Sequence, residues 1–268
     1  MTLPAVGRRR RLVPPLLVVV LLLLAWEAYA RASGVSPFVL PPPSRVLVAL
    51  WEFRDDALRH LVPTVIETVV GFGISIVTAT AVAISLDRVA WIRGAVEPLL
   101  VGSQTIPIIA IAPLLVVWFG FGLLPKVLVV VLVTFFPITV ALLDGFGSTP
   151  ADASDLLRSF GASPGQAFRM LRWPSGLPAF FTGLRISASY AVVAAVIGEY
   201  VGATEGLGIW MQLSQRSFRT DLVFAAILLT AVLSVALYVA VAVAERAIIP
   251  WWHASRGARQ SERASGAG

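Results

Sequence analysis

Long stretches without a charged residue dominate this sequence. The segments 62–86, 99–119, 126–144, 186–203 and 222–244, together with 12–30, each come close to the roughly 20 mostly apolar residues that a helix needs to cross a bilayer. Only 13% of all residues are charged, against about a quarter in soluble domains. Such a chain has too little polar surface to fold in water. We therefore predict an all-α membrane protein with six transmembrane helices.

The distribution of basic residues predicts the orientation of these helices. If residues 1–11 lie in the cytoplasm, the inner connections and the tail 246–268 hold twice as many Lys and Arg residues as the outer connections. Both termini are then cytoplasmic, and the longest inner loop is 147–185. Because the positive charge marks one face of the membrane, no nucleic-acid partner is needed to explain it.

A second interpretation of the N-terminus stays open. Arg8–Arg11, an apolar run and then Ala28-Tyr29-Ala30 have the outline of a secretory leader with a small-residue cleavage site. The length of the run, and Glu27 close to that site, favour a retained helix. Either interpretation leaves the other five spans in the same orientation.

The outer connection 31–61 is predicted to hold more than a loop. Pro41–Pro43 favour an extended backbone, and Ser44 is a candidate N-cap for an amphipathic helix over Arg45–Leu58. Such a helix would lie along the outer interface in contact with membrane lipid. A role in gating and a simple linker are both open. The tail after His253 is rich in Gly, Ala, Ser and Arg, which predicts disorder.

The residues that are rare in this sequence exclude several kinds of chemistry. There is no cysteine, and His60 and His253 are the two histidines, so disulfides, thiolate catalysis and the usual zinc spacings are excluded. Lys126 is the single lysine and lies in Leu-Pro-Lys-Val, outside any phosphate-binding loop. We predict a chain with no catalytic residue, cofactor or metal of its own.

The inner loop contains two sets of helix signals. Thr149 and Pro150 predict an N-cap and a first helical residue, and Gly161 predicts the end of that helix after Phe160. Ser163-Pro164-Gly165-Gln166 predicts a capping box, and Pro174 predicts that the second helix ends near Trp173. Residues 149–173 thus form two short helices joined at a glycine, which we call the elbow. Its predicted exposed apolar residues are Leu156, Leu157, Phe160, Phe168 and Leu171.

Three interpretations of the elbow can be compared. An apolar face with basic flanks fits a groove on a partner protein. Alternatively, the elbow packs against the ends of its own helices. A DNA-binding helix-turn-helix is disfavoured because the loop is tethered between two spans.

The elbow resembles the loop of type I ABC importer permeases. That loop has the pattern Glu-Ala-Ala, three residues, Gly, nine residues and Ile-x-Leu-Pro. With Gly161 as the anchor, Asp155 takes the glutamate position, Leu156 and Leu157 replace the alanines, and residues 171–174 form the ending. The resemblance implies that these residues contact an ATPase subunit: Asp155, Leu156, Leu157, Phe160, Gly161, Ala162, Phe168, Leu171 and Pro174.

Further motifs resemble the nitrate, sulfonate and taurine branch of the same family. They fall at residues 40–44, 106–114, 118–122, 177–178, 182–185, 206–208 and 251–252, and include Glu199. The resemblance covers about residues 36–252. Within the branch, residues 103–107 are most similar to permeases for pyrimidine precursors of thiamine.

The resemblance implies a multi-subunit importer in the plasma membrane of a prokaryote. Its expected parts are two permease chains as a homodimer, two ATPase subunits that bind ATP and Mg, and an external binding protein. Its cargo would be a sulfonate, nitrate, taurine or a thiamine-pyrimidine precursor, moved by alternating access. A secondary transporter or channel without an ATPase is the alternative, and a structural scaffold a third, but neither explains the elbow.

The candidate pathway or gate residues are Gln104, Thr105, Pro107, Pro113, Glu67 and Glu199. Glu67 and Glu199 are ionisable groups at membrane depth, where such groups are functional candidates. Glu67 either reaches lipid headgroups or has a role in transport, and Glu199 either joins two spans by a hydrogen bond or forms part of a gate. Because no arginine lies inside a span, we expect a weakly polar lining and a specificity that resides in the binding protein. The expected polar lining is Gln104, Thr105, Thr134, Ser187, Ser189 and Tyr190.

Overall fold

The computed structural model describes residues 13–88, 94–95, 98, 102 and 105–252. The regular structure of this part of the chain is helical, without a strand. The predicted cytoplasmic segment 1–11 and the predicted disorder after His253 lie outside the described residues. In chain order the helices are α1 Val13–Ala32, α2 Pro43–Glu52, α3 Arg54–Asp87, α5 Ile108–Phe119, α6 Leu123–Gly147, α7 Ala151–Ser159, α8 Pro164–Ala167, a π-helical turn Phe168–Arg172, α9 Trp173–Glu199, α10 Leu207–Arg216 and α11 Thr220–Ile248.

Four of these helices are long and apolar enough to cross a membrane. They are α3, α6, the continuous helix Pro164–Glu199 and α11. Helices α3, α6 and α11 contain the second, fourth and sixth predicted spans, and Pro164–Glu199 contains most of the fifth. Helix α1 coincides with the first predicted span and has 20 residues, about 30 Å of helix. Of the third, 99–119, the structure describes the 12-residue helix α5. The count of six spans stays a prediction.

The boundaries of two predicted spans differ from the structure. Helix α3 begins at Arg54 rather than at residue 62, so the end of the outer connection belongs to it. The fifth span lies in a helix that begins well before residue 186 and ends at Glu199 rather than at residue 203.

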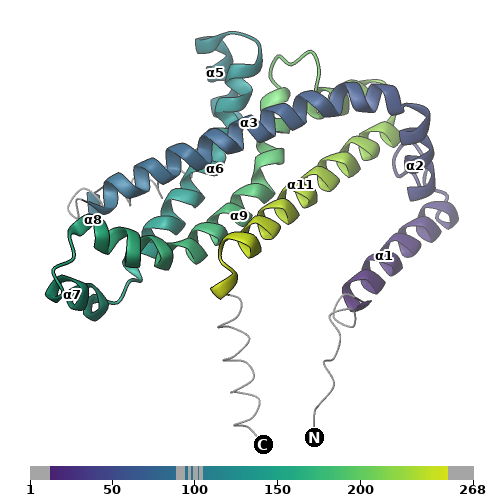
Figure 1. The fold of residues 1–268 in the computed structure, drawn as a ribbon. Coiled ribbons are helices and arrows are strands. Elements are labelled where there is room, and N and C mark those ends of the chain that lie inside the picture. The colour runs from purple at the N-terminus through teal and green to yellow at the C-terminus, as the bar shows by residue number, and fades with distance from the viewer. Residues whose placement is uncertain (1–12, 89–93, 96–97, 99–101, 103–104, 253–268) are drawn as a thin grey trace, which may run out of the picture.

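The helices give the molecule two opposite ends (Figure 1). Helix α2 lies at one end, and α7 and α8 lie at the other, where α3 also finishes. The first residues of α1 and the last residues of α11 both point away from α2. This arrangement agrees with termini on one side of the membrane, while the side itself stays a prediction.

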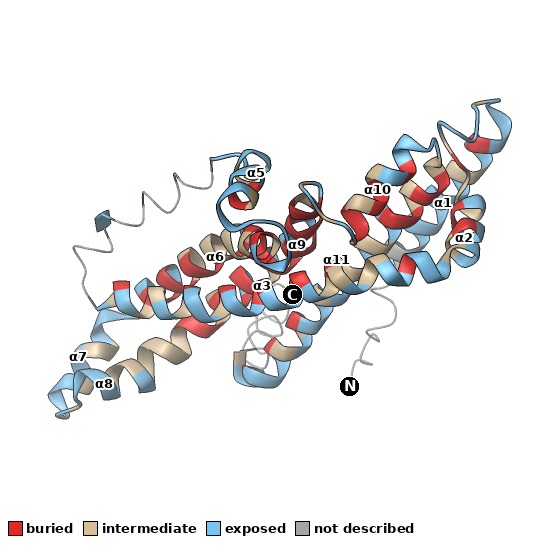
Figure 2. Cartoon of the chain, turned by 90° about the horizontal axis from the view of Figure 1, so that it is seen from above, coloured by how far each residue is buried: buried red, intermediate tan, exposed pale blue. Residues whose placement is uncertain are grey.

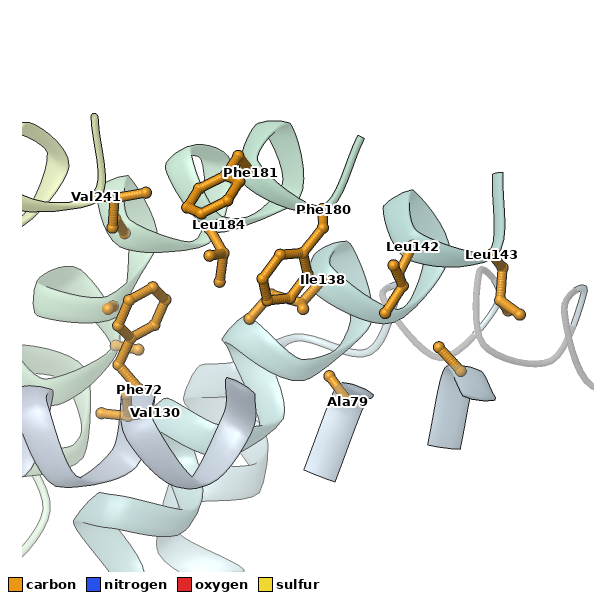
Figure 3. Close-up of a cluster of buried hydrophobic side chains, with 14 of the residues drawn as sticks. Phe72, Ala79, Val130, Ile138, Leu142, Leu143, Phe180, Phe181, Leu184 and Val241 are labelled. Carbon is orange, nitrogen blue, oxygen red and sulfur yellow. The ribbon is translucent and has the colours of Figure 1, made fainter. Parts of the chain in front are cut away.

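The core lies between α3, α6 and α9, with α6 and α9 in the most extensive contact. Ile138, Leu142 and Leu143 of α6 are fully buried there, and Phe181 and Leu184 of α9 pack around them (Figure 3). Buried residues follow α6 and α9, whereas α7 and α8 are largely exposed (Figure 2).

Glycines let α6 and α9 approach closely. A Cβ at Gly183 would come within 2.7 Å of the Cβ of Ala141 and 2.9 Å of the Pro137 carbonyl oxygen. A Cβ at Gly145 would lie 2.9 Å from the Cα of Gly176. Small residues at helix crossings are the usual means of close packing in a membrane, where lipid is as apolar as the side chains.

Helix α2 differs from the helix predicted in the connection 31–61. It begins at Pro43 after an N-cap at Pro42 and ends at Glu52, so the predicted helix over Arg45–Leu58 is wrong and its last residues belong to α3. Ser44 is not the N-cap either. Its backbone N–H donates to Glu27 Oε2 at 3.0 Å and its hydroxyl to Glu27 Oε1 at 2.8 Å. A carboxylate from α1 therefore satisfies the first turn of α2, where the helix dipole favours negative charge.

Candidate functional site

The first helix of the elbow starts one residue later than predicted. Helix α7 begins at Ala151, and the N-cap is Pro150, whose extended backbone (φ −60°, ψ 129°) needs no help from Thr149. The prediction of Thr149 as a side-chain cap is therefore wrong. Asp152 lies in the first turn, as expected for an acid near a helix N-terminus.

The turn between the two elbow helices matches its prediction. Gly161 has φ +82°, the left-handed conformation that glycine adopts without a steric penalty. The N–H of Gly161 donates to the Arg158 carbonyl at 2.9 Å, and the N–H of Ala162 to the Leu157 carbonyl at 3.1 Å. These bonds close the C-terminus of α7.

The second elbow helix starts as predicted but does not stop. Ser163 and Gln166 form the predicted capping box, with Ser163 N donating to Gln166 Oε1 at 2.8 Å. The helix then continues through Pro174 into α9, so the predicted end near Trp173 is wrong. The π-helical turn Phe168–Arg172 explains this, because there the Trp173 N–H donates to the carbonyl five residues back. This local change of register accommodates a proline at the start of α9.

The elbow presents part of its apolar surface to the exterior. Phe160 is 79% exposed and Leu156 57% exposed, and α7 has no buried residue. Leu157, Leu171, Ala162 and Pro174 are half-buried, while Asp155 is exposed. Phe168 is not exposed as predicted, because its ring packs against Phe146 and Trp173 at 5.5 and 6.3 Å between centroids. Met170, at 67% exposure, is an exposed apolar residue that the sequence pattern missed.

Two ion pairs connect the long helices with one another. Arg172 Nη1, at the end of the π-helical turn, lies 2.6 Å from Asp87 Oδ2 at the end of α3. Arg185 of α9 pairs with Glu245 of α11 and lies over the ring of Tyr238. Sequence reasoning counted these arginines as orientation signals and did not assign them partners.

At the opposite end, the N-terminus of α10 is capped by side chains from two other helices. Gly206 N–H donates to His60 Nδ1 at 3.1 Å and Leu207 N–H to Thr64 Oγ1 at 2.9 Å. Gly208 N–H donates to Glu199 Oε2 at 2.5 Å. Thr64 Oγ1 in turn donates to Glu199 Oε1 at 2.5 Å.

This arrangement decides part of what the sequence left open about Glu199. The carboxylate is fully buried, joins α9 to α3, and satisfies an amide that the first turn of α10 cannot pair internally. The predicted hydrogen bond between spans is confirmed. Thr64 was missed, although its spacing of three residues from Glu67 places both on one face of α3.

Glu67 does not reach toward headgroups. Its side chain is 1% exposed and pairs with the amino group of Lys126. Lys126 lies in the first turn of α6, and its side chain is 12% exposed. The headgroup interpretation is therefore wrong, and the single lysine has a structural partner. A cavity of about 280 Å³ lies beside the pair and is also lined by Thr204 and Glu205.

Replacing Lys126 is expected to destabilise the protein. In Lys126→Met, Glu67 loses its counter-ion, and its second carboxylate oxygen already has no hydrogen-bond partner among the described residues. Leaving one partner of a mostly buried pair alone should cost about 3 kcal/mol. Thermal unfolding in detergent will measure the loss, and the double variant Glu67→Gln/Lys126→Met should recover at least half of it. Unchanged stability of the single variant would contradict the assignment.

A larger cavity lies between α5, α6 and α9. Its volume is about 880 Å³, and its lining includes Thr105, Pro107, Phe136, Asp144 and Tyr190. Two predicted pathway residues, Thr105 and Pro107, are thus brought together with Tyr190. Gln104 lies outside the described residues, and Pro113 lies within α5 away from the lining.

Other predicted lining residues have structural roles. Thr134 and Ser187 are fully buried, and the Ser187 hydroxyl donates to the Thr134 carbonyl at 3.0 Å, which joins α9 to α6. Ser189 donates to the Arg185 carbonyl of its own helix. Phe136 and Asp144 were missed because periodicity alone does not show which side of a wholly apolar helix faces a cavity. Among the described residues, no group of three His, Asp or Glu side chains is placed to hold a metal ion.

Comparison with known proteins identifies the family. Residues 71–250 match the binding-protein-dependent transport system inner membrane component. The formylaminopyrimidine transport permease protein ThiX of Halalkalibacterium halodurans is 39% identical over 84% of this chain and 90% of its own. The riboflavin transport system permease protein RibX of Chloroflexus aurantiacus is 33% identical, and the taurine transport system permease protein TauC of Escherichia coli is 30% identical, each over 84% of this chain and 85% of its own.

These matches span both ends of the molecule, from α3 through the elbow to α11, and they confirm the resemblance drawn from the motifs. The family is one of inner-membrane subunits, in agreement with the four long apolar helices. Its members work in ABC transporters together with an ATPase and a binding protein. The chain therefore belongs to the type I ABC importer permeases, in the branch that includes the sulfonate, taurine and ThiX permeases.

Proposed function

We propose that this chain is the permease subunit of an ATP-driven importer built from two copies of the chain, two ATPase subunits and an external binding protein. The elbow is the observation that carries the proposal. It projects from one end of the molecule and exposes Leu156, Phe160 and Met170, whereas Phe168 is packed. An exposed apolar elbow at the end of a membrane bundle fits a groove on a partner subunit.

The elbow is rigidly connected to α9 and can therefore transmit a displacement to that helix. Gly161 and the capping box fix the shape of α7 and α8, and the π-helical turn joins them to α9 without an interruption of the helix. A displacement of the elbow by closing ATPase subunits therefore reaches the spans directly. Driving a two-state switch from 1:99 to 99:1 takes about 5.5 kcal/mol, which ATP binding has to deliver through this contact.

We further propose that the solute is an uncharged nitrogen heterocycle of the pyrimidine type. The large cavity offers the rings of Phe136 and Tyr190 for stacking and the oxygens of Thr105 and Asp144 for N–H donors. No Lys or Arg is among the described residues that line it, so a sulfonate or nitrate would find no counter-charge there. ThiX is named for a formylaminopyrimidine and RibX for riboflavin, which is a larger nitrogen heterocycle. The main selectivity would still reside in the binding protein.

Reconstitution tests both proposals. The chain, a candidate ATPase subunit and a candidate binding protein are placed in liposomes with labelled formylaminopyrimidine or labelled taurine. We expect ATP-dependent uptake of the pyrimidine in preference to taurine. An ATPase subunit whose phosphate-loop lysine is replaced serves as the control and should abolish uptake. Uptake that persists without any ATPase would establish the secondary transporter instead, and a preference for taurine would overturn the solute class alone.

A further inference from the structure

The ion pair between Arg172 and Asp87 joins segments that are far apart in the chain. Arg172 is the last residue of the π-helical turn, and Asp87 is the last residue of α3. Arg172 Nη1 lies 2.6 Å from Asp87 Oδ2, and the Asp87 side chain is 6% exposed. The two residues are 85 positions apart. Figure 1 shows that α3 finishes at the same end of the molecule as α7 and α8.

The position of Asp87 is unfavourable without a partner. The C-terminus of a helix carries partial negative charge, so an acid there is repelled by the carbonyls of its own last turn. Burial adds the cost of removing a carboxylate from water. Arg172 compensates both effects by a charge-assisted hydrogen bond. Asp87 is therefore a specific contact between α3 and the π-helical turn and not a solvated surface charge.

The other side-chain contacts of the elbow are with α6 and α9, the helices that precede and follow it in the chain. Phe168 packs against Phe146 at the end of α6 and against Trp173 at the start of α9. Helix α7 precedes this turn and contributes no buried residue. Among the described residues, the side-chain bond that connects this region to α3 is the one from Arg172.

We propose that Arg172 and Asp87 are positioning residues that make α3 move together with the elbow. This inference rests on the proposed function, in which the elbow receives the motion of the ATPase. Helix α9 follows the elbow through its backbone. Helix α3 has no such direct backbone link; it packs on α6 and α9, and this ion pair adds a side-chain bond from its last residue to the π-helical turn. The part of α3 from Thr64 to Asp87 is a 24-residue helix by its numbering, about 36 Å long.

The pair thereby connects the elbow to the buried polar side chains at the other end of this part of α3. Thr64 and Glu67, at the far end of this helix, hold Glu199, the N-terminus of α10 and Lys126. A displacement of Asp87 that leaves α3 rigid has to shift these contacts as well. Without the pair, α3 would follow the elbow through its packing on α6 and α9 alone, and its last turn would no longer be tied to the π-helical turn.

The test measures coupling in the complete transporter. Asp87→Asn and Arg172→Gln should leave co-purification with the ATPase and its hydrolysis rate nearly unchanged, but lower the solute taken up per ATP by about tenfold. The charge swap Asp87→Arg/Arg172→Asp should restore most of this ratio. Asp55→Asn is the matched control, because it removes an acid from the exposed first turn of the same helix, where it is 91% exposed.

A second measurement does not depend on transport. The chain contains no cysteine, so Ser85→Cys on α3 and Gly165→Cys on α8 introduce the two spin-label sites without any background. Both positions are exposed. In the wild-type background we expect the distance between the labels to be the same in the ATP-free and the ATP-trapped complex, and in Asp87→Asn to change between the two.

The outcomes separate the two hypotheses. If the wild-type chain neither binds the ATPase nor needs it for uptake, the proposed function fails. If the wild-type transporter is ATP-dependent but Asp87→Asn keeps both its uptake per ATP and an unchanged label distance, the positioning role of the pair is refuted and the function stands. A charge swap that folds and assembles without restoring coupling also refutes it.

Discussion

The Gly206→Ala variant is expected to lose much of the stability of the fold. Gly206 has φ +133°, a conformation that L-residues rarely adopt, and a Cβ there would overlap the carboxyl group of Glu199. To relieve the overlap, the loop before α10 has to move, and Glu199 then loses the Gly208 amide inside a buried cluster. Backbone strain together with a displaced buried carboxylate should cost about 4 kcal/mol.

Thermal unfolding in detergent, followed by tryptophan fluorescence, measures this loss. Trp210 is 5% exposed and stacks on His60 beside the altered residue, so it reports on the region directly. A loss of this size corresponds to a lowering of Tm by roughly 8–16 °C for a chain of this length. Gly73→Ala is the control. Gly73 lies in the middle of α3, and a Cβ there would contact nothing within 4 Å, so this variant should not lower Tm. An unchanged Tm for Gly206→Ala would show that the capping of α10 contributes little.

The Phe160→Asp variant is expected to abolish coupling without affecting the fold. Phe160 is 79% exposed, so the isolated chain loses almost no packing when the ring is removed. At the proposed contact with the ATPase, however, a charge would replace a large apolar side chain. Central aromatic residues of an interface typically contribute 2 kcal/mol or more, and uptake should fall by about 30-fold or more.

Two measurements distinguish loss of docking from loss of folding. Co-purification of the ATPase with the variant should fail, while its Tm in the absence of the ATPase stays at the wild-type value. Phe160→Met retains an apolar side chain at the same position and should keep most of the uptake. Full co-purification of the ATPase with Phe160→Asp would show that the docking surface lies elsewhere on the chain.

Local signals in the sequence were sufficient to predict much of the elbow. Gly161 and the pair Ser163–Gln166 act within a few residues of themselves, so their conformations hardly depend on the rest of the molecule. Pro174 was misleading for the same reason. The rule that proline ends the preceding helix assumes α-helical register, and the π-helical turn before it changes that register through packing of Phe168 on α6 and α9.

The buried charges show what periodicity cannot supply. Glu67 and Glu199 stood out because they interrupt apolar runs, but their partners Lys126 and Thr64 lie on the sequence at distances that no local rule connects. Glu27 likewise looked like an interruption of the first helix, and its function as the cap of α2 became visible only in three dimensions. Six apolar stretches fixed the helical class, whereas the interhelical partners required the fold.

The close crossing of α6 and α9 has a mechanical consequence. The helix that begins in the elbow runs unbroken from Pro164 to Glu199, and Gly183, one of the glycines at which it approaches α6 closely, lies near its midpoint. When a rigid helix tilts about a point near its middle, its two ends move in opposite directions. A tilt about Gly183 would carry the elbow and Glu199 in opposite directions by similar amounts, so that opening at one face of the membrane and closure at the other would be two ends of the same movement.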